Sequence, residues 1–260
     1  MPTKRLVFLA GLFLAVTAAH ADTPAVGIVD HPCATEPSMQ EAGGWNPWHV
    51  WLYAHDYGQL CYYRRQNAAL PAPSPATPRV VFMGDSITEI WHQQDPHFFT
   101  DGRIDRGISG QTTSQMLVRF RQDVIDLHPA VVHIMAGTND IAGNTGNQTL
   151  GMVENHLATM AELAHAHGIR IVLASVPPSD HMNWQPTVKP APVIRRLNRW
   201  IKAYAARHGY VYVDYYHALT SADGGMRPGL SSDGVHPTKK GYAIMEPLTL
   251  AAIRKALAKH

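Results

Sequence analysis

The most constraining feature of the sequence is the alternation of strand-like and helix-like segments from Arg79 onward. Short apolar runs typical of buried strands alternate with longer stretches of helical periodicity. The predicted strands cover residues 79–84, 102–107, 130–136, 169–176 and 210–214, and the predicted helices cover 86–94, 112–127, 148–167, 190–208 and 238–257. Five such units predict an α/β fold with a five-stranded parallel sheet and helices on both faces, which is a three-layer α/β/α sandwich.

Right-handed crossovers place the carboxyl ends of all five strands at one edge, where open α/β sheets bind ligands. Ser86 follows the first predicted strand through Gly84-Asp85 and begins a predicted helix. Glycine permits a tight turn there, and the helix directs free backbone N–H groups and its positive dipole end toward the serine. We therefore take Ser86 as a candidate nucleophile; the alternative is an ordinary turn serine.

A candidate base stands near the C-terminus, in Asp233-Gly234-Val235-His236-Pro237. An aspartate three residues before a histidine can hold the Nδ1–H of the imidazole if both lie on one turn. Nε2 is then free to accept a proton from a serine. The alternative is a surface turn with a solvated histidine, which has weight in a chain with 16 histidines.

Two further loops follow predicted strands and offer hydrogen-bond donors. Asn139, in Ala136-Gly137-Thr138-Asn139-Asp140, can donate a side-chain amide hydrogen to a developing oxyanion. Its alternative role is to cap the next helix. A second donor is the backbone N–H of Gly107, in Asp105-Arg106-Gly107-Ile108-Ser109-Gly110. Without a side chain in the way, this N–H can approach a substrate closely. The alternative is an ordinary loop that contains glycine.

The ordered set of these four motifs resembles the GDSL, or SGNH, hydrolase family over roughly residues 79–258. The resemblance implies a flavodoxin-like sandwich and a secreted carboxylic ester hydrolase of the GDSL type. It implies Ser86 as nucleophile, His236 as general base and Asp233 as the residue that orients it. It also implies an oxyanion hole made by the N–H groups of Ser86 and Gly107 and the side chain of Asn139. The family's usual leucine after the serine is Ile87 here, a conservative change.

The N-terminus has the pattern of a secretory signal peptide over residues 1–21. Lys4 and Arg5 precede an apolar stretch, and Ala19-His20-Ala21 has the form of a cleavage site. The stretch is short for a membrane span. We therefore expect a periplasmic or extracellular protein without stable membrane insertion. Residues 22–78 are predicted to form an N-terminal extension, and residues 79–260 the catalytic domain.

The extension contains the two cysteines of the chain, Cys33 and Cys61. In an oxidising compartment we expect them to form a disulfide, with two buried free thiols as the alternative. A helix is predicted from about residue 49 to residue 70, and its aromatic side chains either dock it on the catalytic domain or form a substrate platform. A proline-rich connector, residues 70–78, follows.

Composition restricts the partners. The formal net charge of +2 gives no electrostatic case for nucleic acid. We predict no metal and no cofactor, because the serine mechanism implied by the resemblance needs neither. Glu162, His165 and His167 could suggest a metal site, but their spacings do not place all three on one face of their predicted helix. A long loop follows the fourth predicted strand, and long loops at this edge of a sheet often shape substrate pockets. Trp184, which lies in this loop, is therefore a candidate substrate contact. Oligomeric state is left open by the sequence.

The resemblance and the compartment favour short acyl groups, mainly acetyl, on a carbohydrate or a small alcohol. One alternative is a lysophospholipase or lipase-like esterase for longer acyl chains. An acyltransferase with the same triad is another, and a noncatalytic binding module is disfavoured by the complete set of residues.

Overall fold

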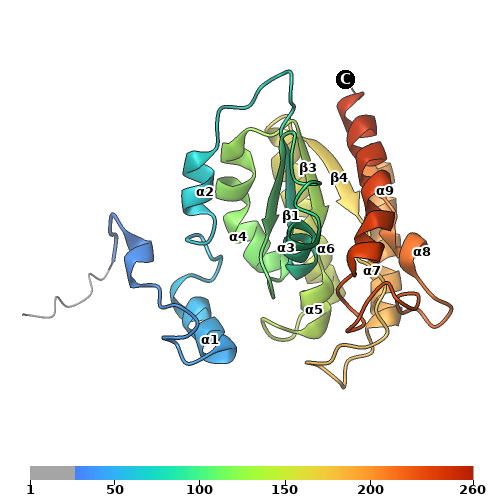
Figure 1. Cartoon of the computed structure of the whole chain (residues 1–260), viewed down its shortest axis with the longest axis horizontal. Helices are drawn as coiled ribbons and strands as arrows, with labels where there is room; N and C mark the ends of the chain where they lie inside the picture. Colours follow the sequence, from blue (N-terminus) through green and yellow to red (C-terminus); the bar gives the residue numbers. More distant parts are fainter. Residues whose placement is uncertain (1–26, 260) are drawn as a thin grey trace, which may run out of the picture.

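The computed structural model describes residues 27–259, so the predicted signal peptide lies outside the described residues. Figure 1 shows a central sheet with helices on both sides. The sheet is parallel throughout, with strand order β2-β1-β3-β4-β5. This confirms the predicted α/β sandwich. The strands are β1 (Val80–Gly84), β2 (Arg103–Gly107), β3 (Val131–Met135), β4 (Arg170–Ala174) and β5 (Val211–Val213).

The longer helices that follow the strands fall close to their predicted positions. They are α3 (Ser86–Gln94), α4 (Thr113–Asp123), α6 (Leu150–Ala166), α7 (Pro190–Arg207) and α9 (Lys239–Leu257). The segment predicted as one helix over 112–127 is divided into α4 and a 3-10 turn, Ile125–Leu127. Two short helices, α5 (Thr138–Ala142) and α8 (Tyr215–Leu219), were not predicted from the sequence. Each has five residues, which is too short to display helical periodicity.

Two apolar layers hold the sheet because successive side chains of a strand point to opposite faces. Val81 and Met83 of β1 pack in the layer that contains α4, α6 and α7. Val80 and Phe82 of the same strand pack in the layer that contains α3, α8 and α9. Every residue of β1 is buried, as expected for an inner strand covered on both faces.

The N-terminal extension differs from its sequence-based description. The predicted helix over 49–70 is two helices, α1 (Trp45–His55) and α2 (Arg64–Ala69), after a 3-10 turn at Pro32–Thr35. Asp56 interrupts the helix because its carboxylate accepts the backbone N–H groups of Leu60 and Cys61 at 2.9 and 3.0 Å. Gln59 then adopts a left-handed conformation, with φ 53°.

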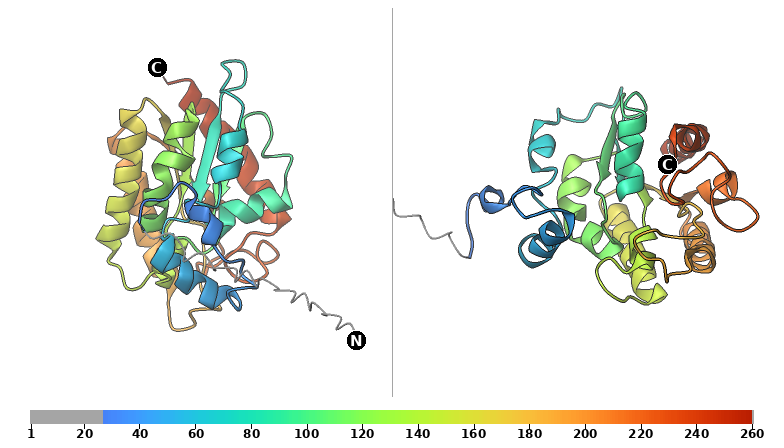
Figure 2. Two further views of the ribbon diagram at one scale, coloured as in Figure 1. Left: turned by 90° about the vertical axis from the view of Figure 1, so that its left-hand side faces the viewer. Right: turned by 60° about the horizontal axis from the view of Figure 1, so that its bottom comes forward.

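Hydrogen bonds join the residues before β1 to the loop after β2 and to α4. Gln111 and Gln115 donate to the carbonyl groups of Gly58 and Tyr57 at 3.1 and 2.9 Å. A disulfide between Cys33 and Cys61, with Cα atoms 5.5 Å apart, closes the segment that contains α1. Figures 1 and 2 show α1 at the same end of the molecule as α5, beyond the carboxyl ends of the strands. Within residues 27–259, none of the helices is long and apolar enough to cross a membrane.

Candidate active site

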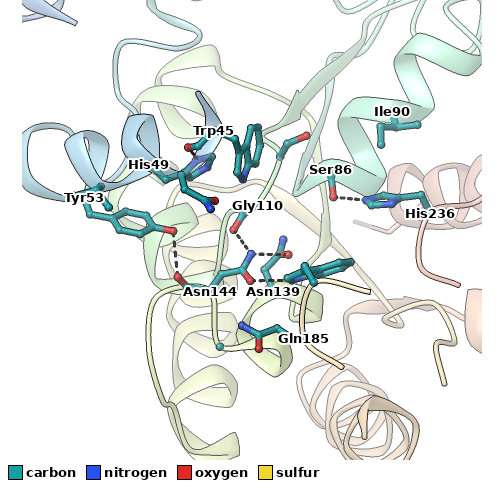
Figure 3. A pocket seen from close by; sticks show the side chains of 15 residues that line it. Trp45, His49, Tyr53, Ser86, Ile90, Gly110, Asn139, Asn144, Gln185 and His236 are labelled. Carbon is teal, nitrogen blue, oxygen red and sulfur yellow. Dashed lines mark hydrogen bonds between the residues drawn. The ribbon is translucent and has the colours of Figure 1, made fainter. Parts of the chain in front are cut away.

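A serine, a histidine and an aspartate form a chain of hydrogen bonds at the carboxyl edge of the sheet. Ser86 begins α3 directly after β1, and its Oγ lies 2.8 Å from Nε2 of His236 (Figure 3). Nδ1 of His236 lies 2.6 Å from Oδ2 of Asp233. Since a carboxylate only accepts, Nδ1 bears the imidazole proton and Nε2 is the acceptor for the serine hydroxyl. This is the arrangement in which an imidazole can remove a serine proton.

The loop before α9 fixes Asp233 in its ionised form. Its Oδ1 accepts the backbone N–H groups of Val235 and His236 at 2.9 and 2.8 Å and the hydroxyl of Ser231 at 3.1 Å. Burial raises the pKa of Asp233, but the hydrogen bonds from the side chain and backbone of His236 outweigh burial and lower it to about 2. The lowered pKa favours the carboxylate form of Asp233, which is the form that accepts the Nδ1 proton of His236.

Buried polar groups hold the turn that presents Ser86. Asp85 caps α3, because its Oδ1 accepts the backbone N–H of Ile87 at 2.9 Å. Burial raises the pKa of Asp85 to about 6, although that hydrogen bond and nearby His236 oppose the effect. Arg119, fully buried and paired with Asp123 at 3.1 Å, donates to the carbonyl of Gly84 at 3.0 Å. The backbone on the strand side of the serine is thus fixed.

Asn139 lies where the sequence analysis placed it, at the edge of the same pocket as Ser86. It is in α5 and is buried, with 3% of its surface exposed. One hydrogen of its amide nitrogen is donated to the carbonyl of Gln111 at 3.0 Å, and its Oδ1 accepts from Asn144 at 3.0 Å. Within the described chain this leaves the second amide hydrogen for a ligand. The neighbouring Asp140 accepts the backbone N–H of Thr113 at the start of α4.

The structure contradicts the assignment of Gly107 to the oxyanion hole. Its N–H is already donated to Oδ1 of Asp105 at 2.7 Å. Gly107 packs β2 closely against α3, since an added Cβ would lie 2.4 Å from the backbone nitrogen of Glu89 and 2.7 Å from the backbone oxygen of Asp85. The glycine is needed for this contact between elements, and it is not among the residues that line the pocket with Ser86.

A second glycine in the same loop, Gly110, lines the pocket with Ser86 and Asn139. Its φ of 80° lies in the left-handed region that favours glycine. Gly107 and Gly110 stand three residues apart in the same sequence motif, so the motif itself contained the glycine that lines the pocket. The path of the loop after β2 decides which of them reaches the pocket.

The pocket itself has a volume of about 700 Å³. Helix α1 forms one wall with Trp45, His49 and Tyr53, and the loop after β4 contributes Trp184 to the lining. Trp45 and Trp184 are 47% and 42% exposed, so their apolar surfaces face solvent or a ligand. The sequence analysis named Trp184 as a candidate contact. It missed Trp45, which precedes the helix predicted from about residue 49, and His49, which it placed only at the start of that helix.

A model of the GDSL-like Lipase/Acylhydrolase family matches residues 82–244, more than half of the chain. Over 170 residues the chain is 26% identical to platelet-activating factor acetylhydrolase IB subunit alpha1 of Bos taurus, covering 64% of this chain and 70% of that protein. It is 29% identical over 140 residues to Esterase TesA of Pseudomonas aeruginosa, covering 52% of this chain and 60% of that protein.

A solved structure is more similar. The crystal structure of a GDSL-like lipase from Bacteroides thetaiotaomicron shares 46% sequence identity with this chain and superposes with a TM-score of 0.75. The match covers 77% of this chain and 100% of that one. Ser86, Asn139 and the Asp233–His236 pair all fall inside the matched range of the family model. The chain therefore belongs to the GDSL-like lipase/acylhydrolase family, a family of carboxylic ester hydrolases.

Proposed function

We propose that this protein is a secreted serine esterase that hydrolyses short acyl esters, mainly acetyl esters, of carbohydrates or small alcohols. The observation that supports it most directly is the chain of hydrogen bonds from Ser86 through His236 to Asp233, at 2.8 and 2.6 Å. Such a chain lets a neutral imidazole activate a serine hydroxyl. The proposal of secretion depends on the signal-peptide pattern of residues 1–21.

The proposed reaction has two halves. Oγ of Ser86 attacks the ester carbonyl while Nε2 of His236 removes the hydroxyl proton, and a tetrahedral oxyanion forms. His236 then gives the proton to the leaving alcohol, and an acyl-enzyme remains on Ser86. Water, activated by the same imidazole, attacks the acyl-enzyme and releases the acid.

We assign the oxyanion donors to the N–H groups of Ser86 and Gly110 and the side chain of Asn139. Ser86 is the first residue of α3, so its N–H lies among the four at a helix start that have no partner within the helix. Gly110 and Asn139 line the same pocket. Each such donor contributes about 100- to 1,000-fold to the rate in other serine hydrolases.

The acetyl preference is supported by the relative from Bos taurus, whose name describes an acetylhydrolase. The exposed indoles of Trp45 and Trp184 give flat apolar surfaces on which the alcohol part of a substrate can pack. The second candidate function is hydrolysis of longer acyl chains. It is favoured by Ile90 and by Val50, 68% exposed, which add apolar surface to the pocket.

The central experiment replaces Ser86 by alanine and measures hydrolysis of p-nitrophenyl acetate. We expect kcat to fall by about 10⁴-fold or more, with circular dichroism and thermal melting unchanged. Ser74→Ala, at an exposed serine of the connector, is the matched control and should retain full activity. Undiminished turnover by folded Ser86→Ala would refute the nucleophile assignment.

Substrate preference is tested with a series of p-nitrophenyl esters from acetyl to dodecanoyl, next to acetylated xylan. A maximum of kcat/KM at acetyl, with acetate released from the polymer, supports the first proposal. A maximum at eight or more carbons supports the second. Addition of a sugar acceptor, with product analysis, separates hydrolysis from acyl transfer.

A further inference from the structure

We propose that Asn144 is a positioning residue, which holds Asn139 and Gly110 in the orientation that presents their N–H groups to the substrate oxyanion. The inference rests on the proposed esterase function. Asn144 follows α5 and lines the pocket, but it lies beyond the Gly-x-Asn-Asp motif that drew attention to Asn139. Its role therefore has to be argued from its contacts alone.

Every hydrogen-bonding group of the Asn144 side chain has a partner, and the partners fix which way the amide faces. Nδ2 has two hydrogens, which are donated to the carbonyl of Gly110 and to Oδ1 of Asn139, both at 3.0 Å. Oδ1 accepts from the indole Nε1 of Trp184 at 3.2 Å. An indole N–H can only donate and a carbonyl can only accept, so a flipped amide would lose all three bonds.

The Asn144 backbone is held as well. Its N–H donates to the carbonyl of Asn139 at 3.1 Å, and its carbonyl accepts the hydroxyl of Tyr53 from α1 at 3.1 Å. Gly143 ends α5 in a left-handed conformation, with φ 75°, and so turns the chain. Figure 3 shows Asn144 between Tyr53, Gly110 and Asn139, with its hydrogen bonds drawn to each.

The consequence for Asn139 is directional. Because its Oδ1 is occupied by Asn144, its NH₂ group faces the opposite way, where one hydrogen meets Gln111 and the other is left for a ligand. A half-turn of the Asn139 amide would put a carbonyl oxygen, in place of an N–H, beside the negative charge of the tetrahedral intermediate. Asn144 thus fixes the sign of the dipole that Asn139 presents to the reaction.

The consequence for Gly110 concerns its peptide planes. Glycine has wide backbone freedom, so a loop glycine needs external contacts to keep one conformation. The hydrogen bond from Asn144 to the Gly110 carbonyl restrains the peptide on one side of the residue. The Gly110 N–H lies in the preceding peptide plane, so Asn144 restrains this donor only through the conformation of Gly110, whereas it holds the Asn139 amide directly.

The test compares Asn144→Ala, Asn144→Asp and Trp184→Phe in steady-state hydrolysis of p-nitrophenyl acetate. We expect Asn144→Ala to lower kcat by about 10- to 100-fold with little change in KM, since the loss arises only in the transition state. Asn144→Asp is nearly isosteric but has no hydrogens to donate. Its carboxylate attracts the NH₂ of Asn139 away from the pocket, so we expect a loss of about 100- to 1,000-fold. Trp184→Phe keeps an aromatic ring but removes the hydrogen bond from the indole to Asn144 Oδ1. It should lower kcat less than Asn144→Ala or Asn144→Asp does.

A double-mutant cycle separates positioning from a general structural effect. In an Asn139→Ala background one of the two groups that Asn144 holds is gone, so Asn144→Ala should lower kcat by a smaller factor than it does in the wild-type background. Asn155→Asp, at an exposed position of α6, is the matched control for the Asn-to-Asp change and should leave kcat unchanged. Thermal melting of each variant shows whether it is folded.

Three outcomes overturn the proposal while leaving the esterase function intact. They are wild-type kcat in folded Asn144→Asp, a change confined to KM, and effects of Asn144→Ala and Asn139→Ala that multiply. The failure of the proposed function has a different signature, which is persistent turnover by Ser86→Ala. If Asn144→Ala does not fold, the kcat values of Asn144→Asp and Trp184→Phe still test whether Asn144 positions the oxyanion donors.

Discussion

Asp85 offers a sharp prediction about stability, because it is a buried carboxyl group next to the nucleophile. Only 1% of its surface is exposed, and burial raises its pKa from an ordinary value of 3.8 to about 6. The change we consider is Asp85→Asn. Asparagine keeps an oxygen that can accept the backbone N–H of Ile87, so the cap on α3 is retained while the buried charge is removed.

The sign of the effect follows from proton binding. Between pH 3.8 and about 6 the folded protein keeps the Asp85 proton and the unfolded chain has lost it, so stability falls as pH rises through this window. At 1.36 kcal/mol for each pKa unit, the ionised carboxylate costs about 3 kcal/mol of the free energy of unfolding at pH 7. Asp85→Asn should therefore be more stable by up to about 3 kcal/mol at pH 7 and nearly unchanged at pH 3.5.

The assay is urea unfolding followed by far-UV circular dichroism, at intervals from pH 3.5 to pH 7.5. In a domain of this size the gain corresponds to a rise in Tm of roughly 6–12 °C at pH 7. Asp126→Asn, at an exposed aspartate whose contact to Arg121 is 3.8 Å, is the control and should change stability by less than about 0.5 kcal/mol. A difference between Asp85→Asn and wild type that is the same at every pH would refute the reasoning.

Three further predictions follow from the site and the extension. Gly107→Ala should lower the free energy of unfolding by about 2–3 kcal/mol, because its Cβ would meet the backbone of α3; equal stability in urea would contradict this close contact between β2 and α3. Asp233→Asn should lower kcat by about 10⁴-fold. In the wild type, protonation of Asp233 should not lower the rate above about pH 3, because the pKa of Asp233 is about 2. A pH–rate profile of both proteins checks these two expectations. Replacing Cys33 and Cys61 by serine opens a loop of 28 residues and should cost about 3.5 kcal/mol in chemical unfolding; an unchanged midpoint would contradict this.

The fold was predictable because its signals are local. Buried parallel strands appear in the sequence as short apolar runs, and the five predicted runs match the five strands of the sheet. The break between α1 and α2 was missed because it depends on side-chain capping. The Asp56 carboxylate competes with the helix for backbone N–H groups, an effect that apolar periodicity does not reveal.

The candidate site was predictable only in part. The topology brings Ser86 and Asn139 to one edge of the sheet, and the short spacing of Asp233 and His236 allows them to meet on one turn. The choice between Gly107 and Gly110 depends on how the loop after β2 turns, which their shared motif leaves undecided. The role of Asn144 depends on contacts with α1 and the loop after β4, and no local pattern connects those segments.

Helix α1 has a consequence for how such an enzyme can diversify. Trp45, His49 and Tyr53 form a wall of the pocket, yet they precede residues 82–244, the region that defines the family. Selection on the N-terminal segment can change which alcohols or acyl groups fit while the groups that break the ester bond stay the same. Directed evolution of substrate preference would therefore best begin with the residues of α1 that line the pocket.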